Sequence, residues 1–292
     1  MKMSLDNLIL NVKCVTFDKY QSFISDLATN LLTTDIEDKS VLSQYTKQTA
    51  REYHYNVLVG SGDGGAYIGF QHNSERYDVI KGCSLKLEVN PNKEKKEQAI
   101  LAEIFKKHFE GYTIFIRGLD LALDLEIDKN AIIPVSLTGR QQDRHKGTIY
   151  FGNRGKHGYL RIYDKKKELE EKQKVEVSVE HLTRIEFCCR LQDGLMLNFF
   201  NALELEMDKL YQITVFDDGE LQEVDPVTKA ILFSYKNGYQ DLKDFTRTYK
   251  NKVKMALSNM RVVGLDNAFE NAKESIEEIL LKFIGNKTLS TV

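Results

Sequence analysis

The sequence contains few of the residues that build metal clusters and disulfide frameworks. Its four cysteines include no CxxC pair, and its six histidines include no HxH or HExxH pair. Cys188 and Cys189 are adjacent, so on a strand their side chains would point to opposite faces of the sheet. A zinc site, a disulfide framework and histidine-based metal chemistry are therefore not indicated, and we expect reduced thiols in the core.

Long apolar runs are also absent. The run that ends at Leu10 and the run over residues 279–284 are far shorter than the roughly 20 residues of a membrane-spanning helix. The opening MKMSLDNLIL carries no small-residue cleavage signal. We therefore expect a cytoplasmic protein, and its 292 residues are enough for one large or two modest domains.

The charge is nearly balanced, at a net of -2, but it is distributed unevenly along the chain. Residues 140–167 hold nine Lys or Arg and two acids, and residues 245–261 hold five basic residues and no acid. Between these blocks, residues 204–225 hold eight acids and one lysine. Two separate basic blocks suit a long polyanion better than a small ligand. Solvated helix and loop faces would give the same pattern.

Residue patterns predict a unit of three strands and a helix that then recurs. Strands are expected in EYHYNVLV, AYIGF and CSLKLEV, followed by an amphipathic helix over residues 93–109. A similar series follows and ends with a helix from about Gly194 to Leu210. LEVNPNK (residues 87–93) and RIEF (residues 184–187) are the local echo of a structural repeat. The GxGxxG match at residues 60–65 precedes a strand, which favours a hairpin loop over a dinucleotide site.

The chain beyond Leu210 reads as a short strand, ITVF, followed by helices. The pair Asp225-Pro226 marks a boundary. Three helical segments follow, and the last is expected to be capped by Asp266 or Asn267 and closed by Gly285. The predicted fold is α+β, an antiparallel sheet with packed helices. It divides into an N-terminal segment (residues 1–50), a core (residues 51–215) and a helical C-terminal subdomain (residues 216–292).

Two strands carry acids on one face. In RGLDLALDL, alternation places Asp120 and Asp124 on the face opposite the leucines, and in TRIEF it places Glu186 beside Arg184 and Cys188. Aspartates are disfavoured on apolar strands, so they need solvent or a cation. Three carboxylates of this kind suit Mg²⁺ or Mn²⁺. A solvent-facing sheet surface would give the same pattern.

A basic hairpin lies between these two strands. Its strands TIYFG and YLRIY flank a turn with Arg154 and Lys156. Positive charge beside tyrosine and phenylalanine rings is typical of surfaces that bind single-stranded DNA. Tyrosines also fill sheets routinely, so each ring taken alone is expected to pack in the core.

These motifs together resemble the Rep_trans family, the replication initiation factors of Gram-positive rolling-circle plasmids, which are related to relaxases of integrative conjugative elements. The resemblance rests on RxxDxAxD (residues 117–124), TIYFGNRGKHGYLRIYDK (residues 148–165) and RIEF, with LEVNPNK upstream. It implies a nicking-nuclease fold and origin-specific nicking, in which a tyrosine attacks DNA and leaves a phosphotyrosine and a free 3′-OH.

The resemblance also implies roles for individual residues. Asp120, Asp124 and Glu186 are the candidate metal ligands. Lys165 or Arg161 would contact the phosphate, and Lys165 is also a candidate catalytic residue. Host helicase and polymerase are implied partners, and a homodimer is compatible with the sequence. The full set of expected DNA contacts is Arg154, Lys156, Arg161, Lys165, Arg247, Lys250, Lys252 and Lys254, the last four in a helical subdomain that would recognise the origin.

The expected nucleophile is missing from its family position. On the segment that follows RIEF, the matching residues are Phe199 and Phe200, which cannot attack phosphate. Tyr211 and Tyr163 are the alternative nucleophiles. Two other functions stay open: a non-catalytic origin-binding initiator that lost its nucleophile, and a conjugative relaxase.

Overall fold

The computed structural model describes residues 2–33, 42–44, 53, 55–60, 65–71, 83–91, 96–221 and 224–284. The chain forms two compact units that are interleaved in sequence. Unit 1 contains residues 1–3, 122–188 and 204–271, and unit 2 contains residues 4–121, 189–203 and 272–292. These limits differ from the expected boundaries at residues 50 and 215. Within the described ranges, no helix is long and apolar enough to span a membrane.

Unit 2 contains the predicted meander and helix. Its elements are β1 (Lys2–Lys13), α1 (Phe17–Thr33), β2 (Leu42–Gln44), β3 (Tyr55–Val59), β4 (Ala66–Phe70), β5 (Cys83–Val89) and α2 (Lys96–Phe109). The strands lie in the order β2-β3-β4-β5-β1, and each neighbouring pair is antiparallel. The hairpin prediction for the glycine cluster is confirmed by the β3–β4 pair, although residues 61–64 lie outside the described ranges.

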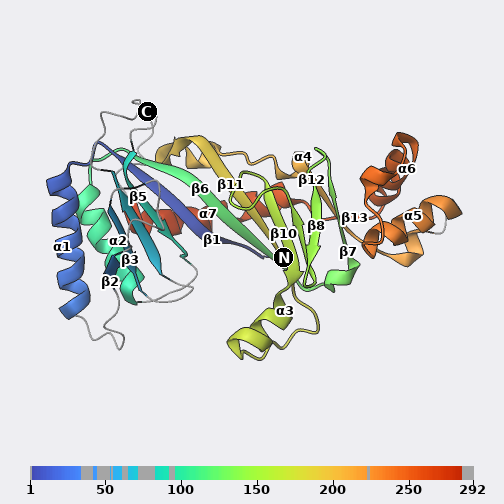
Figure 1. The fold of residues 1–292 in the computed structure, drawn as a ribbon, viewed down its shortest axis with the longest axis horizontal. Coiled ribbons are helices and arrows are strands. Elements are labelled where there is room, and N and C mark those ends of the chain that lie inside the picture. The colour runs from blue at the N-terminus through green and yellow to red at the C-terminus, as the bar shows by residue number, and fades with distance from the viewer. Residues whose placement is uncertain are drawn as a thin grey trace. The chain divides into compact units, whose positions relative to one another are not determined.

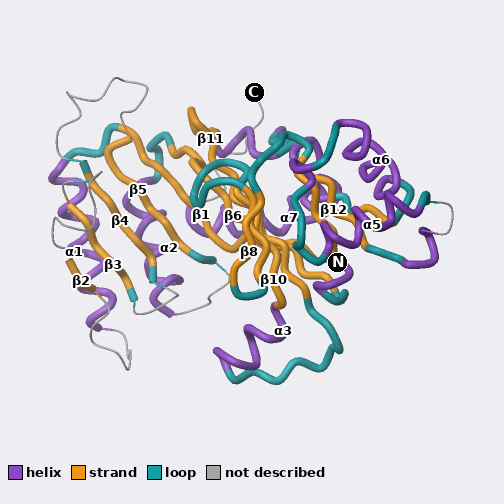
Figure 2. The backbone as a smooth tube through the Cα atoms, turned by 45° about the vertical axis from the view of Figure 1, so that its right-hand side comes forward, coloured by secondary structure: helices purple, strands orange, loops and turns teal. Residues whose placement is uncertain are grey.

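The helices α1 and α2 lie side by side against the sheet of unit 2 (Figures 1 and 2). Their contact is aromatic, because Phe23 is fully buried and packs edge-on against Phe109, with ring centroids 5.1 Å apart. Lys107 and His108 bind Asp26 across the two helices. Spacing of buried residues by three and four positions thus places the predicted amphipathic face of α2 against its neighbour.

Unit 1 contains a second sheet portion with the same strand order. The acid-bearing strands are β6 (Ile114–Leu125) and β11 (Thr183–Met196), each of which has residues in both units. With β8 (Gln142–His145), β9 (Thr148–Phe151) and β10 (Tyr159–Asp164), they form the order β8-β9-β10-β11-β6. This order matches β2-β3-β4-β5-β1 strand for strand, and LEV and IEF occupy the equivalent strands β5 and β11. The sheet orders therefore support the predicted repeat.

The C-terminal helices pack on a small sheet of unit 1. That sheet has the order β13 (Arg261–Val262), β12 (Tyr211–Val215) and β7 (Ile132–Ser136), and the helices are α5 (Pro226–Lys236) and α6 (Arg247–Ser258). A third helix, α7 (Leu265–Ile284), has residues in both units. Asp225 caps α5, since its carboxylate accepts from the main-chain N–H of Thr228. Buried residues of β7, α5 and α6, among them Val135, Leu232 and Leu257, form one core cluster. The predicted α+β class with a helical C-terminal part is confirmed.

The helix expected from Gly194 to Leu210 is wrong. β11 continues to Met196, a 3-10 turn (η5) covers Leu197–Ala202, and only Met207–Leu210 forms a helix, α4. Two left-handed residues explain the difference: Gly194 has a φ of 71° and Glu206 a φ of 51°, and neither value fits a continuous right-handed helix. Cys14 is exposed, so the expectation of core thiols is wrong there, whereas Cys188 and Cys189 are free and buried.

Asp266 and Asp208 cap each other's helices. Asp266 lies inside the first turn of α7, and its carboxylate accepts from the main-chain N–H groups of Met207 and Asp208 at 2.8 and 3.1 Å. Asp208 in turn accepts from the N–H groups of Leu265 and Asp266 at 2.9 and 3.1 Å. Burial raises the pKa of Asp208 against the opposing effect of these bonds. The expectation that Asp266 or Asn267 caps α7 is therefore wrong, because Asp208 of α4 accepts from its first N–H groups. The expected end at Gly285 lies outside the described residues.

Asp208→Ala should destabilise the protein by about 1 to 2 kcal/mol, because the first N–H groups of α7 lose their acceptor. Urea unfolding followed by circular dichroism measures the change. Glu204→Ala removes the same charge from an exposed side chain and is the control. Equal unfolding midpoints for the two variants would contradict the capping role.

Candidate active site

Glu186 is the buried carboxylate of unit 1. It lies on β11 with 9% of its surface exposed, directly opposite Arg161 of β10, whose guanidinium donates to Oε2. The hydroxyl of Tyr163 donates to Oε1 at 2.6 Å. A buried carboxylate is tolerated when its oxygens are paired and hydrogen-bonded. Glu186 therefore holds an arginine and a tyrosine at fixed positions on the neighbouring strand.

Tyr163 is a half-buried tyrosine with a carboxylate at its hydroxyl. Burial and, next, the charge of Glu186 raise its pKa well above the usual range. The proton therefore stays on the phenol oxygen, which donates it in the hydrogen bond to Glu186. A nucleophile hydrogen-bonded to a base, with the base held by a third group, is the arrangement that covalent catalysis uses. Arg161 is that third group here.

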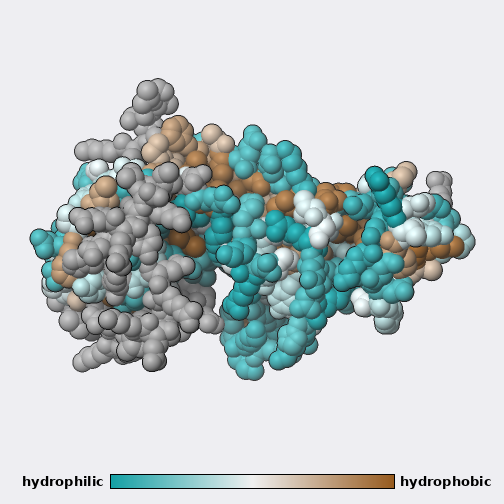
Figure 3. Space-filling view, turned by 45° about the horizontal axis from the view of Figure 1, so that its top comes forward, coloured by the Kyte–Doolittle hydropathy of each residue, from teal (hydrophilic) through white to brown (hydrophobic). Residues whose placement is uncertain are grey.

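Lys165 lies next to this arrangement. Its Nζ is 5.9 Å from the centre of the Tyr163 ring and donates to Glu168 at 2.7 Å. The side chain is buried, at 9% exposed. The segment that Lys165 opens, α3 (Lys165–Glu168) and the following π-helical turn, forms a hydrophilic surface (Figure 3). Lys165 thus places an ammonium group, paired with Glu168, beside the tyrosine.

The two predicted metal aspartates are held by arginines. In unit 1, Arg184 binds Asp124 through two parallel bonds of 2.6 and 2.7 Å. In unit 2, Arg190 donates to Asp120 at 2.6 Å, and Asn7 donates to Asp120 at 3.4 Å and to Glu88 at 3.1 Å. The alternation expected for β6 is confirmed, since Leu119, Leu121, Leu123 and Leu125 are buried and both aspartates are partly exposed.

These carboxylates do not fit a resident Mg²⁺ or Mn²⁺ in the arrangement described. Within the described ranges, no group of three or more His, Cys, Asp or Glu side chains could hold a metal ion. Asp120, Asp124 and Glu186 each accept from an arginine, whose positive charge takes the place that a cation would fill. The sequence indicated Arg184 as a neighbour of Glu186, but the pairing of Arg184 with Asp124 and the bonds of Arg161 and Arg190 depend on strand register.

Of the candidate residues after RIEF, Tyr211 is buried in the core, and Phe199 and Phe200 have no hydroxyl. Tyr211 is 1% exposed, its hydroxyl donates to the main-chain oxygen of Gly158, and its ring packs against Phe151 and Phe187. Burial raises the pKa of Tyr211 to about 12. Phe200 is fully buried, whereas Phe199 is 50% exposed. Of the two candidate nucleophiles, the geometry favours Tyr163.

The basic residues expected to bind DNA lie at two places in unit 1. Arg154 and Lys156 are exposed in the turn between β9 and β10, next to the strand that carries Arg161 and Tyr163. Arg247, Lys250, Lys252 and Lys254 lie on α6. Lys252 forms an ion pair with Asp225 at 3.4 Å. The two basic blocks of the sequence therefore form two separate cationic surfaces.

Comparison with known proteins confirms the resemblance found in the sequence. The model of the replication initiation factor family (Rep_trans) matches residues 130–215, which include β10 and the acid-bearing part of β11. A replication initiation protein of Staphylococcus aureus is 25% identical over 233 residues, covering 74% of this chain and 68% of that protein. A second from the same organism is 26% identical and covers 71% and 67%.

A solved structure also aligns with the chain. The rolling circle replication initiator protein from Geobacillus stearothermophilus is 13% identical, with a TM-score of 0.37, over 90% of this chain and 98% of that one.

Arg184→Gln should raise the affinity for Mn²⁺, because it frees both oxygens of Asp124 from a cation. Electron paramagnetic resonance of free Mn²⁺ measures binding without any reaction. Arg144→Gln removes a guanidinium that binds the main-chain oxygen of Tyr235 and, within the described ranges, forms no ion pair with a carboxylate, so it is the control. Tight Mn²⁺ binding by the unaltered protein, or no gain in Arg184→Gln, would show that arginine does not occupy the cation's place.

Proposed function

We propose that this chain, whose residues 130–215 match the replication initiation factor family, initiates rolling-circle replication of a plasmid by nicking one DNA strand at the origin. The observation that carries the proposal is the hydrogen bond from Tyr163 to Glu186 at 2.6 Å, inside the matched region. The names of the Staphylococcus aureus relatives support the replication role.

The proposed reaction uses the side chains of Tyr163 and Glu186. The Tyr163 oxygen attacks a phosphorus of the DNA backbone while its proton passes to Glu186. A bond forms between the tyrosine oxygen and phosphorus, and the bond from phosphorus to the 3′ oxygen breaks. The 3′ oxygen takes up a proton and becomes the free 3′-OH. The tyrosine carries the 5′ phosphate, so a later attack by a 3′-OH reverses the step and closes the strand.

The positive groups around Tyr163 match the charge of the phosphate. Arg161 and Lys165 lie next to the tyrosine, and Arg154 and Lys156 extend the cationic surface along the hairpin. Such groups stabilise the negative charge that develops on phosphate oxygens. A requirement for Mg²⁺ or Mn²⁺ is implied by the family resemblance alone. The free 3′-OH is where host polymerase and helicase would act, and a homodimer remains a prediction.

Incubation of the protein with supercoiled origin plasmid and Mg²⁺ or Mn²⁺ should give relaxed DNA with covalently attached protein, visible on a denaturing gel. Tyr163→Phe should abolish the adduct and keep duplex binding, because the ring stays and the attacking oxygen is gone. Tyr150→Phe removes a hydroxyl from β9, opposite Arg161, and should keep the adduct. An adduct that survives in Tyr163→Phe would rule out this nucleophile.

A non-catalytic initiator is the second candidate, and the exposed Phe199 favours it. By the family resemblance, Phe199 and Phe200 are the residues expected at the nucleophile position, and of these two only Phe199 is exposed, at 50%. A chain that lost its nucleophile there would form no adduct, and Phe199→Tyr would restore one. Phe200→Tyr is the control, since that side chain is fully buried. An adduct in the unaltered protein, with no gain in Phe199→Tyr, would exclude this candidate.

A further inference from the structure

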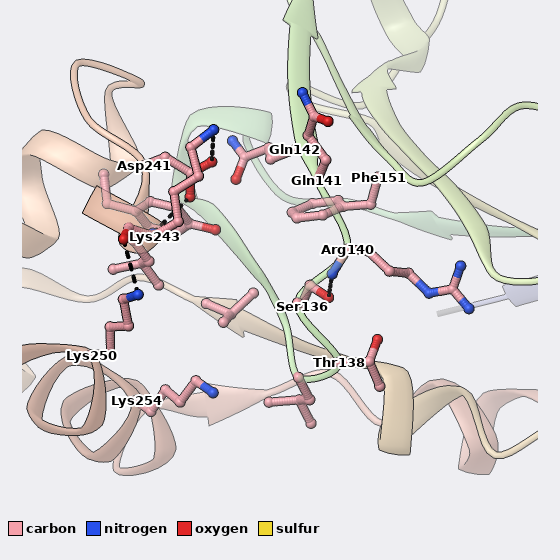
Figure 4. A pocket seen from close by; sticks show the side chains of 15 residues that line it. Ser136, Thr138, Arg140, Gln141, Gln142, Phe151, Asp241, Lys243, Lys250 and Lys254 are labelled. Carbon is pink, nitrogen blue, oxygen red and sulfur yellow. Dashed lines mark hydrogen bonds and ion pairs between the residues drawn. The ribbon is translucent and has the colours of Figure 1, made fainter. Parts of the chain in front are cut away.

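A basic pocket lies in unit 1 between the loop that joins β7 to β8 and the helix α6. It has a volume of about 490 Å³, within the range of about 300 to 1,000 Å³ usual for ligand sites. Its wall includes Ser136 and Thr138 of the loop, and Lys250 and Lys254 of α6 (Figure 4). All of the lining residues belong to unit 1. The pocket is therefore a feature of one compact unit.

The floor of the pocket is rigid. Val135, Phe151 and Tyr235 line it and are each at least 97% buried. The Tyr235 hydroxyl donates to the main-chain oxygen of Pro134 at 2.6 Å, which ties α5 to β7. The main-chain N–H of Arg140 donates to the Ser136 hydroxyl at 2.9 Å and fixes the loop. These contacts hold the loop and α5 in place around the pocket, as a binding site requires.

Positive charge dominates the wall. Among the described residues that line the pocket, Arg140, Lys243, Lys250 and Lys254 are basic and Asp241 is the one carboxylate. Asp241 compensates Lys243, whose Nζ lies 3.6 Å away. The Lys250 ammonium donates to the main-chain oxygen of Lys243 at 3.0 Å, which does not neutralise its charge. Across the described residues, the Lys254 ammonium has no acidic partner, and it extends toward the side of Thr138 (Figure 4).

The lysines of α6 are divided by the turn of the helix. Lys250 and Lys254 are four residues apart and share the face that lines the pocket. Lys252 lies on another face and pairs with Asp225. The three lysines have the same charge and belong to the same helix, yet only two of them reach the pocket.

We propose that this pocket binds a backbone phosphate of a DNA strand, through Lys250 and Lys254, at a position separate from Tyr163. The inference rests on the proposed function for DNA as the partner, and it adds a second, non-reacting contact. Two ammonium groups on one face of α6, with the Thr138 hydroxyl on another part of the wall, are the kinds of donor that a phosphodiester takes. A second anchor of this kind fixes the register of the strand without reading its bases.

Binding of the full chain to a fluorescent single-stranded oligonucleotide of mixed sequence tests the proposal. The double variant Lys250→Ala/Lys254→Ala should bind several-fold more weakly. The slope of log K against log salt should become shallower by about 0.7 for each phosphate that this variant no longer binds. Lys252→Ala removes the same charge from another face of α6, where it is paired with Asp225, and should weaken binding much less than the double variant does. Thr138→Glu places a negative charge at the pocket and should weaken binding without removing a lysine.

If Lys252→Ala and the double variant reduce the affinity for the oligonucleotide equally, the lysines act only through the overall charge of the helix and the proposed phosphate site is wrong. Displacement of the oligonucleotide by inorganic phosphate at constant ionic strength would overturn it in favour of a free-anion site. Unfolding midpoints show whether each variant is folded. If the pocket variants bind normally while the Tyr163 adduct forms, only this inference fails. Absence of DNA binding in the unaltered protein would remove both proposals.

Discussion

The ion pairs between acids and arginines on neighbouring strands are the constraint on which the site depends. Glu186 is buried, and leaving such a carboxylate without a partner would cost several kcal/mol. Arg161 and Tyr163 remove that cost because the register of β10 and β11 places them at its two oxygens. The same bonds fix the tyrosine oxygen in place. One buried charge thus determines both the stability of the pair of strands and the geometry of the reacting group.

The same kind of pairing accounts for the absence of a preformed cation site among the described carboxylates. Arg184 takes both oxygens of Asp124, and Arg190 takes an oxygen of Asp120. A guanidinium neutralises a carboxylate as a metal would, and its planar fork fixes the carboxylate's orientation. The charge on the strands is therefore balanced within the chain, and any divalent ion must compete with an arginine.

Much of the fold could be predicted from the sequence, because alternation and periodicity report which face of an element is buried. The strands with Asp120, Asp124 and Glu186, the helix α2 and the C-terminal helices are examples. The partners of the acids could not be predicted, since alternation fixes a face but not a register. A long helix after RIEF was wrongly expected because the apolar spacing there resembles a helix, while the positive φ of Glu206 interrupts it.

The two halves of the repeat differ at the position that Tyr163 occupies in unit 1. Tyr163 lies opposite Arg184 on β11, and the equivalent residue of unit 2 is Gly69, opposite Lys86 on β5. A Cβ atom at Gly69 would lie 2.8 Å from Cγ of Tyr53 and 2.8 Å from the Tyr67 hydroxyl, so a tyrosine there would require both rings to move. The sheet architecture is shared, but the side chains that fill it differ.

The most direct test of this account is to identify the residue that carries the DNA. The covalent adduct is digested with nuclease and protease, and the phosphotyrosyl peptide is sequenced by tandem mass spectrometry. The account predicts that the modified residue is Tyr163. A phosphotyrosine at Tyr211 or at any other tyrosine would contradict it.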